Sequence, residues 1–150
     1  MTIFATAQLD IDAPLATVFA HFIDFPRWGQ WMPAIFTPIA GPERAFRAGD
    51  SFKVRIGKLP VPLSVVSFRQ DAEFGWRGGS RLVIEGVHTF KFEALGGKTR
   101  IRSEETLSGL LALNLFAEKV RADASAQALV LMERFAIYLS RTYVPEPLSA

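Results

Sequence analysis

Two residues in the second half of the sequence combine a base and an acid at a spacing that predicts contact between them. His88 and Glu105 lie in the range 81–109, which alternates apolar and polar residues around Gly96-Gly97 and predicts two strands joined by a tight turn. A two-residue turn at these glycines places His88 directly opposite Glu105 on the apolar face of the hairpin. An imidazole and a carboxylate so placed can share a charge-assisted hydrogen bond, bind a polar group or move a proton.

The presence of this pair on an apolar face needs an explanation, because buried charged groups are costly unless they are satisfied. Directly opposed residues have Cβ atoms about 4.5–5.5 Å apart, so the two side chains can bond to each other. Three interpretations remain open: mutual satisfaction inside a core, the polar end of a ligand cavity, or an acid–base pair in catalysis. No obvious nucleophile accompanies them. We therefore assign no catalytic residue and keep His88 and Glu105 as candidates.

The elements that must position this pair form an antiparallel sheet and one long helix. In chain order we expect a strand at 3–11, helices at 14–22 and from Asp24 to before Pro33, strands at 34–40, 51–56, 63–70 and 73–77, the hairpin at 81–109, and a helix at 114–143, with turns at 57–60 and 78–80. Short connections between consecutive strands imply a meander, and segregated helices make the fold class α+β.

One face of the sheet and one face of the long helix predict the walls of a cavity. A curved antiparallel sheet gripped by a single helix tends to enclose space, and a mainly apolar pocket with a few polar groups is the usual design of a ligand site. The candidate ligand-binding residues are Phe52, Val54, Phe74, Trp76, Ile84, His88, Phe90, Phe92, Glu105, Val120, Ala124 and Ala128. For Ala124 and Ala128, two interpretations remain open: close packing of helix on sheet, or the roof of the cavity.

Composition narrows the classes of function. The 150 residues suit a single domain, which we expect to span 1–144 with a loose tail at 145–150. The absence of cysteine excludes a disulfide framework and a cysteine zinc site. Only two histidines are present, without clustered carboxylates, so we expect no metal and no cofactor.

Charge and hydropathy favour a cytoplasmic protein with a small-molecule partner. The net charge is +2 and the basic residues are scattered, which gives nucleic-acid binding little support. No stretch approaches the length of a membrane span and the N-terminus does not resemble a signal peptide, so we expect no stable membrane insertion. The oligomeric state cannot be read from these features.

Several motifs resemble a known superfamily. The segments Ile11-x-Ala13-Pro14, Val18-Phe19 and Asp24-Phe25-Pro26-Arg27-Trp28-x-x-Trp31-x-Pro33 resemble the opening of the START-like, or SRPBCC, superfamily, which includes polyketide cyclases, lipid-transfer domains and birch-pollen-allergen-like proteins. The segments Trp76-Arg77-Gly78, Gly86-x-His88-x-Phe90 and Glu105-x-x-x-Gly109-Leu110-Leu111 resemble its bacterial polyketide-cyclase-like branch.

The resemblance extends to about Tyr143 and implies a helix-grip fold. In that fold a seven-stranded antiparallel sheet wraps around a long C-terminal helix, and two short helices after the first strand close one end. In the matching motif we expect Asp24 to cap the second short helix, and Trp28 and Trp31 to pack it onto the sheet; the alternative is that one of the tryptophans lines the pocket entrance.

Three functions remain in competition, because one fold hosts many functions. The first is binding of a small hydrophobic or amphipathic molecule (a lipid, fatty acid, polyketide or isoprenoid) in a cavity between sheet and helix. The second is a polyketide cyclase or aromatase that uses His88 as a base tuned by Glu105. The third is a structural or interaction domain whose 13 Phe and 3 Trp fill the interior completely.

Overall fold

The computed structural model describes residues 2–80, 84–109 and 117–143. Its strands are β1 (Ile3–Ile11), β2 (Phe36–Ala40), β3 (Ser51–Ile56), β4 (Leu59–Arg69), β5 (Glu73–Ser80), β6 (Ile84–Leu95) and β7 (Lys98–Ser108). Its helices are α1 (Leu15–Phe22), the 3-10 helix η1 (Phe25–Gln30) and α2 (Ala117–Thr142).

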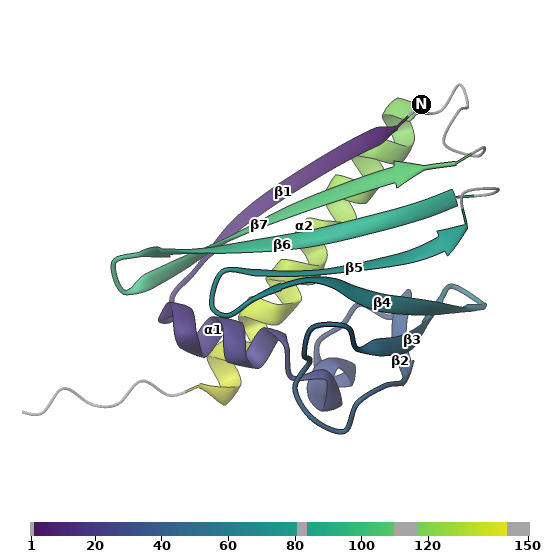
Figure 1. Cartoon of the computed structure of the whole chain (residues 1–150). Coiled ribbons are helices and arrows are strands. Elements are labelled where there is room, and N and C mark those ends of the chain that lie inside the picture. The colour runs from purple at the N-terminus through teal and green to yellow at the C-terminus, as the bar shows by residue number, and fades with distance from the viewer. Residues whose placement is uncertain (1, 81–83, 110–116, 144–150) are drawn as a thin grey trace, which may run out of the picture.

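The strands form one antiparallel sheet in the order β1-β7-β6-β5-β4-β3-β2, with seven strands. The 26-residue α2 runs across one face of this sheet, while α1 and η1 gather at one end of it (Figure 1). The α+β fold class and the helix-grip architecture predicted from the sequence are confirmed. The face of the sheet that α2 covers therefore forms the wall of the protein interior.

The register of the β6–β7 hairpin agrees with the prediction. Leu95 pairs with Lys98 across the Gly96-Gly97 turn, and His88 pairs with Glu105. Gly96 has a φ of 62°, a value that glycine adopts without steric cost. Because side chains alternate between faces along a strand, this register sends His88 and Glu105 toward α2 together.

Some predicted boundaries were wrong. The expected turn at 57–60 is shorter, because Leu59 and Pro60 already pair with β3 in β4. The expected break at 78–80 is strand, since β5 continues through Ser80. The predicted start of the long helix at 114 lies outside the described residues.

The capping prediction for the second short helix was also wrong. Asp24 occupies the N-cap position of η1, but its side chain makes no capping hydrogen bond. Its carboxylate instead accepts a hydrogen bond at 2.7 Å from Arg27, three residues along the same turn. Trp28 and Trp31 are buried as expected, with 0% and 1% of their surface exposed.

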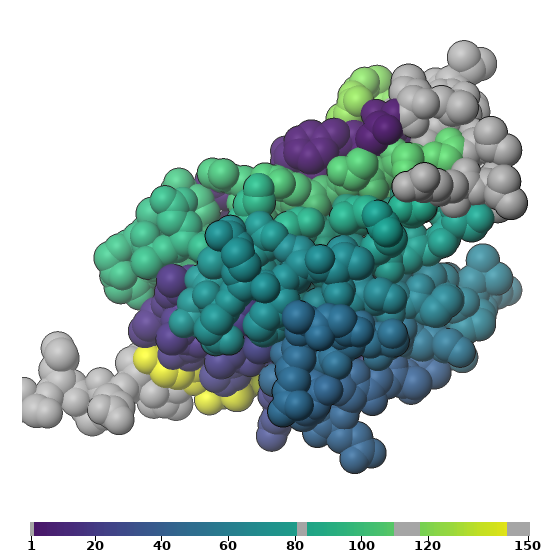
Figure 2. Space-filling view, in the orientation of Figure 1, coloured from purple at the N-terminus to yellow at the C-terminus, as the bar shows by residue number. Residues whose placement is uncertain are grey.

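An aromatic core fills the end of the molecule that α1 and η1 cover. Phe22 of α1 lies 4.8 Å from Phe90 of the sheet and 5.1 Å from Phe135 of α2, measured between ring centroids. Trp28 of η1 contacts Phe52 in the same way at 5.6 Å. In the space-filling view α1 lies beside the C-terminal end of α2 (Figure 2). These ring contacts make this end of the molecule an aromatic core.

Candidate functional site

A cavity of about 620 Å³ lies between the N-terminal half of α2 and the sheet. This volume falls within the range of small-molecule pockets. The described residues that line it come from α2, from the six strands β2 to β7 and from the segment before β2, and they are Pro33, Ile35, Phe36, Ile56, Leu59, Val61, Leu63, Trp76, Gly78, Gly79, Ile84, Gly86, His88, Glu105, Leu107, Val120, Asp123, Ala124, Gln127, Ala128, Val130 and Leu131.

The cavity forms where the inward rows of β5 and β6 change from aromatic rings to glycine. Along β6 the inward residues pass from the buried Phe90 to His88 and then to Gly86. On β5 the matching change ends at Gly78, which pairs directly with Gly86. The two facing glycines line the cavity and bring no side chains of their own to it, and the side chain of Leu63 packs over Gly78.

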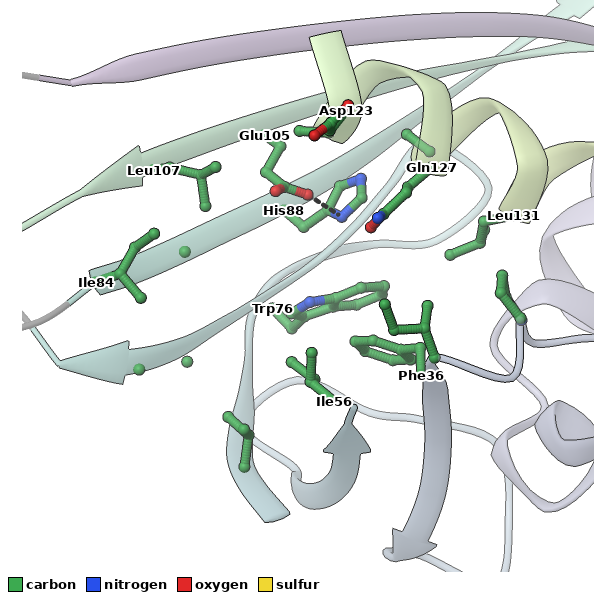
Figure 3. Close-up of a pocket in the computed structure, with 18 of the residues that line it drawn as sticks. Phe36, Ile56, Trp76, Ile84, His88, Glu105, Leu107, Asp123, Gln127 and Leu131 are labelled. Atoms are coloured by element: carbon green, nitrogen blue, oxygen red, sulfur yellow. Dashed lines mark ion pairs between the residues drawn. The ribbon is translucent and has the colours of Figure 1, made fainter. Parts of the chain in front are cut away.

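Seven of the predicted ligand-binding residues line this cavity. They are spread over the sheet and α2, and they are Trp76, Ile84, His88, Glu105, Val120, Ala124 and Ala128. Figure 3 shows Trp76, Ile84, His88 and Glu105 around one space, with α2 on the opposite side. Their role in binding stays a prediction.

The other five predicted wall residues do not line the cavity. Phe52, Val54, Phe74, Phe90 and Phe92 all lie in the buried core. They share the inward face with the cavity residues, but they lie toward the end of the strands that α1 and η1 cover. The residue pattern identified the correct face of each strand and not the position along it where the short helices pack.

His88 is held by hydrogen bonds at both ring nitrogens. Its Nδ1 lies 2.9 Å from Oε2 of Glu105, and its Nε2 lies 2.6 Å from Oγ of Ser103. The ring stacks on Phe90 with centroids 4.3 Å apart and planes 20° apart. A carboxylate can only accept, so Nδ1 carries the hydrogen; the Ser103 hydroxyl can satisfy Nε2 whether the ring is neutral or charged.

Ser103 was not predicted, although the register placed it on the same face as His88 and two residues from Glu105. The resulting chain of serine, histidine and carboxylate has the bonding order of a hydrolase triad. However, Ser103 is only 1% exposed and is not among the residues that line the cavity. It therefore cannot reach a substrate as a nucleophile, and it acts on the site by fixing His88.

Among the described residues on the sheet side of the cavity, the Glu105 carboxylate is a polar group with a free position. One of its oxygens binds His88, and the other is directed away from the ring (Figure 3). The Glu105 side chain is 22% exposed, compared with 9% for that of His88. In this geometry Glu105 has an oxygen that is free to meet a ligand, whereas both ring nitrogens of His88 are occupied.

The mouth of the cavity is bordered by exposed apolar side chains. Ile35, Ile56, Leu59 and Val130 line the cavity and are 48%, 41%, 70% and 46% exposed. Leu59 begins β4 directly after the short turn from β3, so it stands at the tip of a hairpin. An apolar molecule can therefore pass from outside into the cavity without crossing a charged border at these positions.

Two polar residues of α2 complete the wall. Asp123 and Gln127 are one turn apart and lie on the side of α2 nearest Glu105 and His88 (Figure 3). Asp123 is paired with Lys119 at 2.9 Å, and its side chain is 58% exposed.

Within the described ranges, no three His, Asp or Glu side chains come close enough together to hold a metal ion. No helix among the described residues combines the length and the apolar character needed to cross a membrane.

Residues 2–134 match the family described as polyketide cyclase/dehydrase and lipid transport. The chain belongs to this family. The resemblance to the SRPBCC superfamily is therefore confirmed, and membership supports a ligand-binding domain of this type. No curated protein shows significant similarity to the chain.

Solved structures share the fold at low sequence identity. A hypothetical protein from Helicobacter pylori is 18% identical with a TM-score of 0.73, over 90% of this chain and 86% of its own. The di-domain ARO/CYC StfQ from the steffimycin biosynthetic pathway is 10% identical with a TM-score of 0.75, over 95% of this chain and 52% of its own. Ara h 8.0201 is 15% identical with a TM-score of 0.71, over 94% and 99%. At these identities the similarity shows the fold alone.

Proposed function

We propose that this protein binds a small hydrophobic or amphipathic molecule in the cavity between α2 and the sheet. The observation that carries the proposal is the cavity of about 620 Å³ itself, with aliphatic and aromatic walls and the Glu105–His88 pair on its sheet side. Burial of apolar ligand surface supplies the affinity, at about 25 cal/mol per Å² before the costs of association. The few polar groups supply orientation.

The exposed apolar mouth supports the same function. A filled structural domain has no need for a continuous apolar path from its surface to its interior. The hypothesis of a structural domain with a completely packed interior also conflicts with the size of the cavity. The aromatic core fills the end that α1 and η1 cover, while Phe36 and Trp76 line the cavity.

Native mass spectrometry of protein purified from cells tests the proposal, followed by solvent extraction and identification of the released molecule. We expect a bound mass that is lost on extraction, and extracted protein that binds an apolar fluorescent dye. A matched pair of variants controls for dye binding elsewhere: Ala124→Phe fills the cavity, whereas Ala126→Phe adds the same ring at an exposed position that does not line it. Protein that carries nothing and binds no dye would refute the function.

A second candidate function is cyclisation of a poly-β-keto chain. The observation that favours it is the Ser103–His88–Glu105 chain, which holds a carboxylate with one free oxygen against an apolar cavity. Such chemistry needs a shaped cavity and a group that moves protons. Here Glu105 is the group in position to accept a proton from a substrate, with His88 supporting it.

An assay of poly-β-keto substrates tests this second function. Glu105→Gln keeps the shape of the side chain and removes the base, so we expect turnover to fall while substrate binding persists. Equal turnover in the Glu105→Gln variant would exclude this carboxylate as the base.

A further inference from the structure

The polar groups on the cavity wall differ in what they offer a ligand. His88 has no hydrogen free for a ligand, because Nδ1 is bonded to Glu105 and Nε2 to Ser103. The second oxygen of Glu105 can accept a hydrogen bond and cannot donate one in the ionised state. The strongest polar group available on the sheet side of the cavity is therefore an acceptor with negative charge.

The charged residues on the cavity wall also favour a ligand without negative charge. Two carboxylates, Glu105 and Asp123, are among the described lining residues, and no Lys or Arg is among them. Lys119, which does not line the cavity, pairs with Asp123 at 2.9 Å on an exposed part of α2. A ligand carboxylate placed beside Glu105 would meet a like charge in a partly apolar site, where such repulsion is weakly screened.

We propose that the ligand carries a hydrogen-bond donor at its polar end, a hydroxyl or a protonated amine, and that Glu105 accepts that bond. This inference rests on the proposed binding function and narrows its ligand class: it disfavours fatty acids and favours neutral hydroxylated or cationic amphiphiles. His88 and Ser103 act as positioning residues, because they fix the orientation of the Glu105 carboxylate. The apolar part of the ligand lies along Trp76 and the helix.

Three ligands with the same ten-carbon chain test the inference. Extracted full-length protein is titrated calorimetrically at neutral pH with decanol, decylamine and decanoate, which differ only in the polar end. A hydrogen bond to a charged group contributes about 1.5–3 kcal/mol, equivalent to at least about tenfold in Kd. We therefore expect decanol or decylamine, or both, to bind at least about tenfold more tightly than decanoate. Comparison of the two donors separates a hydroxyl site from an ammonium site.

Glu105→Gln and Glu104→Gln form a matched pair of variants. Glu104 is the adjacent residue on the outer face of β7, where it pairs with Lys91 at 3.2 Å. We expect Glu105→Gln to reduce the preference over decanoate severalfold, and Glu104→Gln to leave it unchanged. Decanoate binding as tightly as both donors, or a preference that survives Glu105→Gln, would overturn the inference and leave the binding function standing. Binding of none of the three ligands would overturn both.

Discussion

Replacement of Ser103 by alanine removes the hydroxyl that satisfies Nε2 of His88. The bond is 2.6 Å long, and the two residues are 1% and 7% exposed, so water has little access to the nitrogen that is left. A buried group without its partner costs about 1–3 kcal/mol of stability. At about 2–4 °C per kcal/mol for a chain of this length, we expect Ser103→Ala to lower the Tm by roughly 2–12 °C.

The assay is chemical denaturation followed by tryptophan fluorescence, which gives the free energy of unfolding directly. A double-mutant cycle with His88→Phe isolates the bond, because phenylalanine keeps a ring against Phe90 and has no nitrogen. We expect Ser103→Ala to cost less in that background, by at least about 1 kcal/mol. Ser64→Ala, at an exposed position of β4, is the control and should change stability by less than about 0.5 kcal/mol. An equal loss of unfolding free energy for Ser103→Ala in both backgrounds would refute the hydrogen bond between Ser103 and His88.

Three further predictions concern the cavity, its edge and a distant ion pair. Ala124→Phe should weaken dye or ligand binding at least about tenfold by filling the cavity, whereas Ala126→Phe should not. Gly79→Ala should destabilise the fold by about 1–3 kcal/mol in a denaturation experiment, because φ is +95° and a Cβ would lie 2.2 Å from a carbonyl oxygen of the next strand. The Arg44 guanidinium, bonded to Asp50, lowers the pKa of that carboxyl below 3.8, so its stabilisation is present above that pH and lost as pH falls through the lowered value. The stability difference between wild type and Asp50→Asn should therefore disappear in strong acid.

Each of these three predictions has a clear contrary result. Equal ligand affinity of the Ala124→Phe and Ala126→Phe variants would mean that the ligand lies outside the cavity. A Gly79→Ala protein as stable as wild type would mean that the end of β5 relaxes without cost. A stability difference for Asp50→Asn that stays constant from neutral to strongly acidic pH would exclude the ion pair with Arg44.

The register of the hairpin could be predicted from sequence because local rules determine it. Gly96-Gly97 defines the turn, and alternation then fixes every pair on β6 and β7, including His88 with Glu105. The hydrogen bond between Ser103 and His88 could be identified only from the side-chain geometry, since the same register allows His88 to bond to Glu105 alone. The proposal that Glu105 rather than His88 meets the ligand needed the observation that both imidazole nitrogens are occupied.

The position of the cavity along the strands could not be predicted, because it depends on contacts between distant segments. Phe74 and Gly78 share one face of β5, but Phe74 lies under α1 and η1 while Gly78 lies under the first half of α2. A signal for the cavity was present in Gly78 and Gly86, which line it and carry no side chains of their own. Gly78 was instead assigned to a turn, because Gly78-Gly79 has the composition of one.

Nuclear Overhauser contacts between decanol and the protein would show whether a ligand lies in the cavity between α2 and the sheet. With extracted protein in solution, we expect contacts from the alkyl chain to the methyl groups of Ala124 and Ala128 and to the indole of Trp76. We expect none to Phe74, which is fully buried in the aromatic core and does not line the cavity. Bound decanol whose contacts fall elsewhere on the protein, with none to Ala124, Ala128 or Trp76, would mean that the cavity is not the binding site.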